Sequence, residues 1–345
     1  MDAAHRVRLG EIEFHNLLPE PHGFGSGFAL PRYPRAVRDV LESPGFLTAN
    51  EATGGEIRFV TDALHLRIFL TADVQDMEVD VFRGAFWHST HLLKQGGVSN
   101  IQVTPPDRFS IMRPAALLRG GFHPDVWRVI LDRGSVVFHG LETFGQAVRQ
   151  PTMGETPAIR WLAYGSSITH SSKNGYPAHA ARLLGVDVQN KGLSGSCYIE
   201  REAADFLAAD CEWDFATLEL GINMRLQFTA EEFERRARYL VRRCVEAKPG
   251  RPVVLVSIYP NFANDLAAPA ETAERQAAFD HILRQIADEH RGNNVHLIEG
   301  GSILTDLSWL GVDLLHPTDY GHARMGENLA RALEPFVAKM KATKL

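Results

Sequence analysis

Two short motifs far apart in the chain carry the residue types of a serine-based acyl transfer. Gly165-Ser166-Ser167 follows an apolar run in mid-chain, and Asp313 precedes His316 near the C-terminus. A serine hydroxyl is a poor nucleophile until an imidazole takes its proton. A carboxylate must then fix the imidazole tautomer and stabilise the cation that forms. The sequence therefore predicts Ser167 as nucleophile, His316 as general base and Asp313 as the residue that orients it.

Two further loops lie between these motifs, at residues 190–195 and 220–223. Each follows an apolar, strand-like run. At a strand end a backbone N–H or a side-chain amide can point at the oxyanion that develops during acyl transfer. Four motifs in this order predict a serine esterase.

The composition is that of an ordinary globular protein. The 345 residues are 45% hydrophobic and 23% charged, with a formal net charge of -6. Single cores stop growing at about 250–300 residues, so two domains are expected. The negative charge and the lack of dense Lys/Arg runs argue against nucleic acid as a partner. Cys197, Cys211 and Cys244 have no metal-like spacing and are expected to be reduced, structural thiols.

We also expect no targeting signal in this sequence. The N-terminal residues lack the apolar core of a signal peptide. The longest apolar runs fall far short of the roughly 20 residues that a membrane span needs. A cytoplasmic protein without membrane contact is therefore expected.

The first 150 residues have the pattern of a β-domain. Leu64, Leu66, Ile68 and Leu70 alternate with polar residues, which is the period of a half-buried strand. Similar short runs, separated by turn residues, lie at 56–60, 77–82, 127–131 and 135–138. Strands at this spacing predict an antiparallel sandwich of jelly-roll type as an N-terminal domain, residues 1–150.

The pattern changes after a polar, proline-containing stretch at 146–157, which is typical of a linker. Strand-like runs then alternate with helical ones, and the longest helices are expected at 229–247, 270–290 and 319–341. Alternation of this kind predicts a parallel sheet covered by helices, so residues 151–345 form a three-layer α/β domain of flavodoxin-like type. Each candidate loop lies at the carboxyl end of a strand, where such sheets bind ligands.

Two folds host the order Ser, Asp, His. The α/β-hydrolases need glycine on both sides of the nucleophile elbow. Here Thr169 stands in place of the second glycine, and the acid lies only three residues before the base. Both features argue against an α/β-hydrolase.

Residues 158–335 instead resemble the SGNH (GDSL-type) hydrolase superfamily. The nucleophile block corresponds to Gly165-Ser166-Ser167, the glycine block ends at Gly195, the Gly-x-Asn-Asp block corresponds to Gly221-Ile222-Asn223-Met224, and Asp-x-x-His-Pro is intact at Asp313–Pro317. The resemblance implies an oxyanion hole made by the Ser167 N–H, the Gly195 N–H and the Asn223 amide. The first half is similar to the β-sandwich of a two-domain branch of this superfamily, on the weaker evidence of residues 82–91 and 124–127.

Two residues depart from the family pattern. Ser166 stands where the family has an aspartate before the nucleophile, and Met224 replaces the aspartate after the oxyanion asparagine. Neither change removes a predicted catalytic atom, but the hydrogen bonding behind Ser167 must differ. His170, Met224 and Arg225 lie close to the motifs in sequence and are further candidates for substrate contact.

The expected reaction is hydrolysis of a short-chain ester, with acetyl favoured because no long apolar lid is seen. The aromatic residues Phe86, Trp87 and Trp127 suggest a carbohydrate or another polar alcohol as the esterified group. No metal or organic cofactor is needed, and His88 with His91 lacks a third ligand. An acyltransferase with the same triad and an inactive carbohydrate-binding protein remain alternatives. The sequence does not indicate an oligomeric state.

Overall fold

The computed structural model describes residues 9–23, 27–267 and 270–344. The first eight residues, on which the expectation of no signal peptide depends, lie outside this range, as does the last residue of the predicted second domain. Among the described residues no helix is both long and apolar enough to cross a bilayer.

Contacts within the chain define two compact units, and each is described by itself. The first comprises residues up to Pro34 together with Ala49–Ala158, and the second comprises Arg35–Thr48 and Ile159–Leu345. A stretch from the first half of the sequence therefore belongs to the second unit. The predicted domains, 1–150 and 151–345, place residues 35–48 in the first.

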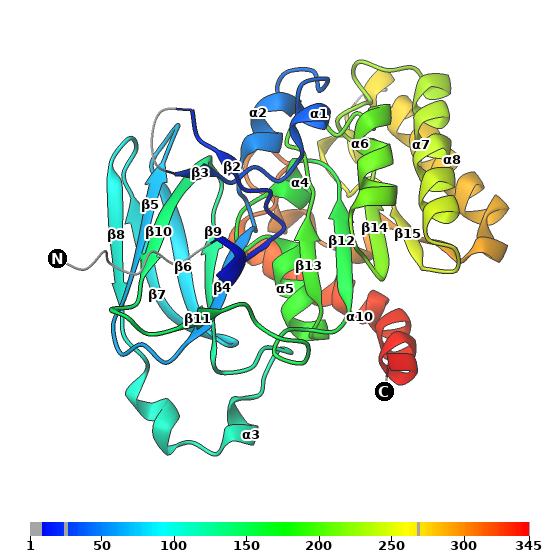
Figure 1. Cartoon of the computed structure of the whole chain (residues 1–345). Coiled ribbons are helices and arrows are strands. Elements are labelled where there is room, and N and C mark those ends of the chain that lie inside the picture. Colours follow the sequence, from blue (N-terminus) through cyan, green and yellow to red (C-terminus); the bar gives the residue numbers. More distant parts are fainter. Residues whose placement is uncertain (1–8, 24–26, 268–269, 345) are drawn as a thin grey trace. The chain divides into compact units, whose positions relative to one another are not determined.

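The first unit consists of two antiparallel sheets (Figure 1). One sheet has the order β1-β4-β9-β6-β7, with β11 paired to β4. The other has the order β2-β3-β10-β5-β8. In sequence the strands are β1 (Glu13–His15), β2 (Glu20–Pro21), β3 (Phe28–Ala29), β4 (Glu56–Thr61), β5 (Leu66–Ala72), β6 (Met77–Arg83), β7 (Phe86–Leu93), β8 (Val98–Val103), β9 (Val126–Leu131), β10 (Val136–Glu142) and β11 (Val148–Arg149). A short helix, α3 (Pro114–Leu117), lies between β8 and β9.

Both sheets contribute to one core. Val79 and Val129 from one sheet, and Ile68 and Phe138 from the other, are buried in the same cluster. The alternation predicted from Leu64 on is observed only from Leu66, with Leu66, Ile68 and Leu70 buried and the residues between them partly exposed. Leu64 precedes the strand and is 73% exposed, so its predicted place on the buried face is wrong. The expected all-β character of this part is confirmed, while the jelly-roll type of its connections stays a prediction. Part of the expected linker is itself ordered, because Val148 and Arg149 pair with β4.

The second unit is built on a five-stranded parallel sheet with the order β13-β12-β14-β15-β16. Its strands are β12 (Arg160–Tyr164), β13 (Asp187–Asn190), β14 (Phe215–Glu219), β15 (Val253–Val256) and β16 (Val295–Ile298). Counted from the start of this unit the order is 2-1-3-4-5, which is flavodoxin-like, and its switch point lies between β12 and β14. The predicted fold class, a parallel sheet flanked by helices and preceded by antiparallel β-sheets, is confirmed.

The longest flanking helices lie where the sequence predicts them. In chain order the flanking helices are α4 (Ser167–His170), α5 (Tyr176–Leu184), α6 (Arg201–Asp205), α7 (Ala230–Ala247), α8 (Glu271–Glu289), α9 (Gly300–Ile303) and α10 (Asp319–Lys344). The Thr229 side chain caps α7 by accepting the Glu232 N–H at 3.3 Å. Helix α6 runs on into a π-helical turn at Phe206–Asp210, and neither was predicted.

One face of the sheet packs on α5 and α10. Trp161, Phe215 and Val254 from the strands share a buried cluster with Ala180 of α5 and Leu329 of α10. Helices α7 and α8 contact each other through the stacked rings of Phe233 and Phe279, whose centroids are 4.0 Å apart. Because the strands pack against these helices, the loops at their carboxyl ends begin from well-packed positions.

Residues 35–48 add two short helices, α1 (Arg35–Arg38) and α2 (Gly45–Asn50), of which α2 extends two residues beyond this stretch. The Thr48 and Ser196 hydroxyl groups lie 3.4 Å apart. Gly45 lies against Leu41 and Ser196, and a Cβ in its place would be 3.2 Å from the Leu41 Cβ and 3.4 Å from Ser196. These contacts attach the stretch to the loop that follows β13.

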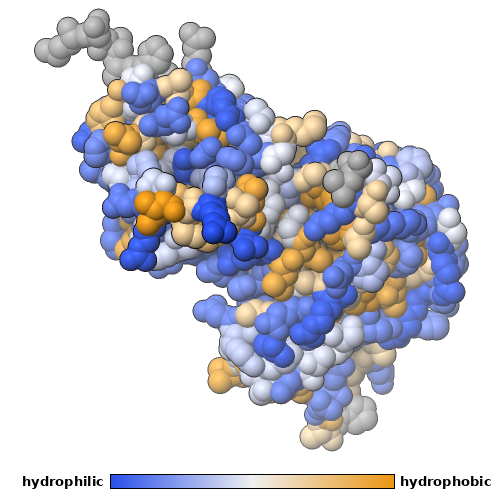
Figure 2. Space-filling model, turned by 90° about the horizontal axis from the view of Figure 1, so that it is seen from below, coloured by the Kyte–Doolittle hydropathy of each residue, from blue (hydrophilic) through white to orange (hydrophobic). Residues whose placement is uncertain are grey.

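Apolar side chains also remain at the surface. On the face in Figure 2, hydrophobic residues occur in small groups between polar ones. Exposed hydrophobic residues are common on soluble proteins, so these groups alone do not define a site.

Candidate functional site

The turn after β12 places Ser167 at the carboxyl edge of the sheet. Ser167 begins α4 and is partly exposed, whereas Ser166 is buried. The Ser166 hydroxyl caps α4 by accepting the Ile168 N–H at 3.2 Å. The two neighbouring serines therefore have different environments, and the buried Ser166 hydroxyl serves as a helix cap.

Ser167, His316 and Asp313 form one hydrogen-bonded chain. The Ser167 Oγ lies 2.8 Å from His316 Nε2. The other ring nitrogen, Nδ1, lies 2.7 Å from Asp313 Oδ2. A carboxylate accepts a proton and does not donate one, so Nδ1 carries the proton and Nε2 is left as the acceptor for the serine hydroxyl. This is the geometry that proton transfer from a serine requires.

The loop before α10 holds Asp313 and His316 in place. The Asp313 Oδ1 accepts the backbone N–H groups of Leu315 at 3.0 Å and His316 at 3.1 Å. The Gly311 N–H donates to the His316 carbonyl at 2.8 Å, which closes the loop. The hydrogen bond from His316, helped by the backbone donors, lowers the pKa of the Asp313 carboxyl below its ordinary value. Asp313 is therefore ionised at neutral pH, and its carboxylate accepts the His316 Nδ1–H.

Two of the three predicted oxyanion donors, Gly195 and Asn223, lie on neighbouring loops. Gly195 is exposed and has φ +69°, a conformation that glycine adopts without strain. The Asn223 Oδ1 accepts the Cys197 N–H at 3.1 Å. Because a backbone N–H needs an acceptor, this contact fixes which end of the amide is the oxygen and leaves the Asn223 NH₂ group as the donor. Asn223 follows β14 and Ser167 follows β12, so they stand on either side of the switch point.

The three further candidates for substrate contact are all buried. His170 is fully buried, and its Nδ1 lies 2.7 Å from the Ser194 Oγ. Met224 is also fully buried. Arg225 is 4% exposed and donates to Asn261 at 2.9 Å and to Gln276. The structure thus places these side chains within the loop packing, and their predicted contact with substrate stays a prediction.

The His322 side chain contacts the loop that follows α4. It accepts the Tyr176 N–H at Nδ1 (3.3 Å), so its Nε2 carries the proton and donates to the Ser171 Oγ at 2.8 Å. Burial lowers the pKa of His322 to about 4. His322 is therefore neutral at physiological pH, and its contacts are those of a packing residue.

Sequence reasoning missed one ionisable group next to the nucleophile. Glu219, the last residue of β14, is 1% exposed, and its Oε2 accepts the Ser166 N–H at 2.7 Å. The available signal was an acidic residue inside the apolar run at 215–220. Buried carboxylates are rare unless they are paired, so such a residue indicates a special environment.

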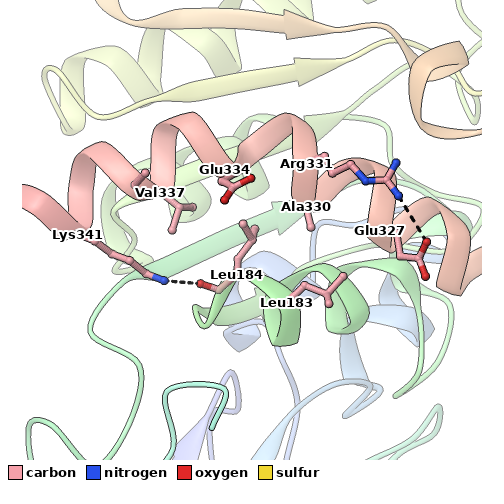
Figure 3. Close-up of a pocket in the computed structure, with 9 residues that line it drawn as sticks. Leu183, Leu184, Glu327, Ala330, Arg331, Glu334, Val337 and Lys341 are labelled. Atoms are coloured by element: carbon pink, nitrogen blue, oxygen red, sulfur yellow. Dashed lines mark hydrogen bonds and ion pairs between the residues drawn. The ribbon is translucent and has the colours of Figure 1, made fainter.

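A separate groove of about 530 Å³ runs along α5 and α10. Figure 3 shows Leu184 and Val337 lining it, with Lys341 donating to the Leu184 carbonyl at 2.7 Å and Arg331 paired with Glu327. None of the predicted catalytic residues lines this groove.

Comparison with known proteins supports the motif assignment. Residues 163–324 match the model of the GDSL-like lipase/acylhydrolase family. The similarity to the SGNH (GDSL-type) hydrolases that the motifs predict is thereby confirmed. The matched residues include the predicted nucleophile, both predicted oxyanion loops and the Asp-x-x-His motif. Among curated proteins, none matches the sequence.

Solved structures share the whole two-part layout. Salicylyl-acyltransferase SsfX3 from a tetracycline biosynthetic pathway is 18% identical, with a TM-score of 0.77 over 94% of this chain and 95% of that one. A family two carbohydrate esterase from Clostridium thermocellum, in complex with cellohexaose, is 11% identical, with a TM-score of 0.61 over 95% and 99%. The acetyl xylan esterase Est2A from Butyrivibrio proteoclasticus is 12% identical, with a TM-score of 0.59 over 96% of both chains. At these identities the likeness shows a shared fold.

Proposed function

We propose that the protein is a serine esterase that hydrolyses a short-chain carboxylic ester, with acetyl as the acyl group and a carbohydrate or another polar alcohol as the leaving group. The observation that carries this proposal is the hydrogen-bonded chain from the Ser167 Oγ through His316 to Asp313, with distances of 2.8 and 2.7 Å. The family match and the fold shared with carbohydrate esterases support it.

In the first step His316 Nε2 takes the proton of Ser167 as its Oγ attacks the ester carbonyl. The tetrahedral oxyanion is stabilised by the N–H groups of Ser167 and Gly195 and by the Asn223 amide. His316 then protonates the leaving alcohol, and an acyl-enzyme on Ser167 remains. Water, deprotonated by the same imidazole, releases the carboxylic acid and restores the serine. These steps use side chains, backbone and water, and they involve no cofactor.

The proposal is tested with p-nitrophenyl acetate and p-nitrophenyl octanoate. Wild type is expected to hydrolyse the acetate faster, and Ser167→Ala is expected to abolish turnover. Ser166→Ala is a matched control, since Ser166 is buried and serves as a helix cap. It is expected to lose about 1 kcal/mol of stability and keep its turnover. Turnover that survives in Ser167→Ala, or is lost only in Ser166→Ala, contradicts the assignment of the nucleophile.

An acyltransferase with the same triad is the second candidate, favoured by the fold shared with salicylyl-acyltransferase SsfX3. The acyl-enzyme is common to both reactions, and they differ in whether water or another acceptor attacks it. Adding glycerol to the acetate assay separates them. A rise in glyceryl acetate at the expense of free acetate favours transfer, and unchanged release of acetate favours hydrolysis.

A protein that binds carbohydrate without catalysis is the third possibility. A fluorophosphonate reacts with an activated serine and not with an ordinary hydroxyl group. Rapid labelling of wild type that is lost in Ser167→Ala is therefore expected. A chain that resists labelling while binding a cello-oligosaccharide supports the non-catalytic alternative.

A further inference from the structure

Glu219 stands directly behind the turn that carries the nucleophile, residues 165–169, here called the nucleophile turn. Its Oε2 accepts two hydrogen bonds from this turn, from the Ser166 N–H at 2.7 Å and the Thr169 hydroxyl at 3.1 Å. The turn lies so close that a Cβ on Gly165 would be 2.5 Å from the Glu219 Oε2. The carboxylate therefore holds the nucleophile turn from both sides of Ser167.

The second oxygen of this carboxylate has a different environment. Glu219 Oε1 is buried and has no hydrogen-bond partner among the described residues. An unsatisfied buried oxygen costs free energy, and a leucine in its place would avoid that cost. A leucine would also leave the buried Ser166 N–H without its acceptor, so the carboxylate serves the nucleophile turn at the cost of one unsatisfied oxygen.

The hydrogen bonds around Glu219 have a fixed direction when the group is ionised. A carboxylate only accepts, so the Thr169 hydroxyl donates to Oε2. The Tyr176 hydroxyl, 2.7 Å from Thr169 Oγ1, must then donate to Thr169. A hydrogen bond to an ionised acceptor is roughly twice as strong as one between neutral groups, so ionisation of Glu219 tightens the Ser166 contact.

The titratable groups around Glu219 come from three other elements. Tyr176 lies on α5, Tyr259 follows β15, and Cys197 lies in the loop after β13. Burial is the main cause that raises the pKa of each of these three groups. The charge of Glu219 is the second cause for Tyr176 and Cys197, and it also raises the pKa of Tyr259. They stay neutral near pH 7. Burial also raises the pKa of Glu219 to about 7, although its hydrogen bonds to Ser166 and Thr169 oppose the shift.

We propose that Glu219 is a positioning residue for the nucleophile, and that its ionised form fixes the backbone of Ser167 for both attack and oxyanion binding. The proposal rests on the proposed function and adds a second group, besides His316, whose ionisation controls activity. A misplacement of about 1 Å at a reacting centre can lower the rate by about 10²-fold, so a loosened turn reduces kcat while substrate binding changes little.

The test compares wild type with Glu219→Gln and Thr169→Val on p-nitrophenyl acetate from about pH 5 to pH 9. Gln keeps the shape and mimics the neutral acid, so kcat is expected to fall about tenfold or more with KM within about twofold. Thr169→Val removes one of the two donors and keeps the Ser166 contact, so kcat is expected to fall by less than in Glu219→Gln. On the acid side, log kcat/KM of wild type is expected to fall with a slope above 1 near pH 7, where protonation of Glu219 adds a drop of about tenfold or more, and that of Glu219→Gln is expected to keep a slope of about 1.

Two outcomes overturn the proposal separately from the function. One is a Glu219→Gln variant that keeps wild-type kcat and the same acid slope while Ser167→Ala is inactive. The other is a wild-type acid slope of about 1, which decides the question even if Glu219→Gln fails to fold. Absence of any turnover that depends on Ser167 overturns the proposed function and, with it, this role.

Discussion

Replacing Asp313 by asparagine is expected to inactivate the protein through the tautomer of His316. The Asp313 Oδ1 accepts two backbone N–H groups, at 3.0 and 3.1 Å, and Oδ2 accepts the His316 Nδ1–H at 2.7 Å. In Asp313→Asn the single amide oxygen is expected to stay with the two backbone donors, because an NH₂ group there would leave them without an acceptor. The NH₂ then faces Nδ1 of His316.

An NH₂ group that faces Nδ1 favours the tautomer with the proton on Nε2. The Nε2 atom lies 2.8 Å from the Ser167 Oγ and must accept its proton. The favoured tautomer cannot do this, and the change that removes the carboxylate also removes the negative charge that stabilises the imidazolium. The equivalent substitution in chymotrypsin-like proteases lowers kcat by about 10⁴, or about 5.4 kcal/mol in activation free energy, and a loss of this order is expected here.

The assay is kcat for p-nitrophenyl acetate near pH 8, with fluorophosphonate labelling as a second readout. Asp313→Ala is the matched control. It removes the carboxylate without placing a donor against Nδ1, so it is expected to keep more activity than Asp313→Asn. Thermal unfolding checks that both variants fold. If Asp313→Asn keeps more than about a tenth of wild-type kcat, or exceeds Asp313→Ala, then the tautomer argument is wrong.

Three further predictions concern the oxyanion loops and Glu219. Asn223→Ala is expected to lower kcat by about 10²–10³ with little change in KM. Asn223→Asp keeps the contact to Cys197 but adds negative charge beside the oxyanion, so its kcat is expected to fall further. If both variants keep wild-type kcat, Asn223 is not an oxyanion donor. Gly195→Ala places a side chain at φ +69° and is expected to cost about 1 kcal/mol of unfolding free energy in a denaturant titration, and no loss of stability would contradict the observed backbone. The pKa of Glu219 is raised to about 7 from an ordinary 4.5, so stability is full at low pH and is lost as pH rises through this window. Relative to wild type, Glu219→Gln should gain about 3 kcal/mol between about pH 4 and pH 8, and a difference that does not vary with pH would mean that Glu219 is not shifted.

The sequence predicted the elements that have strong periodicity. The long helices at 230–247 and 271–289 and the buried strands around Leu162, Leu218 and Leu255 were found near their expected bounds. Their patterns are local, since the helices have an apolar stripe and the strands are short continuous apolar runs. The triad geometry was also foreseeable, because each motif follows a strand of the same parallel sheet or lies just before its closing helix.

Elements with weak periodicity were missed. β7 is mostly exposed, and its polar run His88-Ser89-Thr90-His91 has no apolar alternation, so its pairing with β6 decides its conformation. Residues 35–48 belong to the second unit only through contacts such as that between Thr48 and Ser196, which are distant in sequence. No local pattern contains that information.

The neighbouring serines illustrate what the sequence motif can and cannot decide. Register with Gly165 favoured Ser167 as nucleophile, but only the structure gives Ser166 a separate task, with its hydroxyl on the Ile168 N–H and its own N–H on Glu219. An aspartate at position 166 would bring a second carboxylate close to that of Glu219, and like charges in a buried site repel strongly. A neutral serine at this position is compatible with the Glu219 carboxylate. The departure from the family motif at residue 166 and the unexpected acid in β14 are thus two parts of one local arrangement, and Ser166→Asp is expected to raise the pKa of Glu219 further and to lower stability above neutral pH.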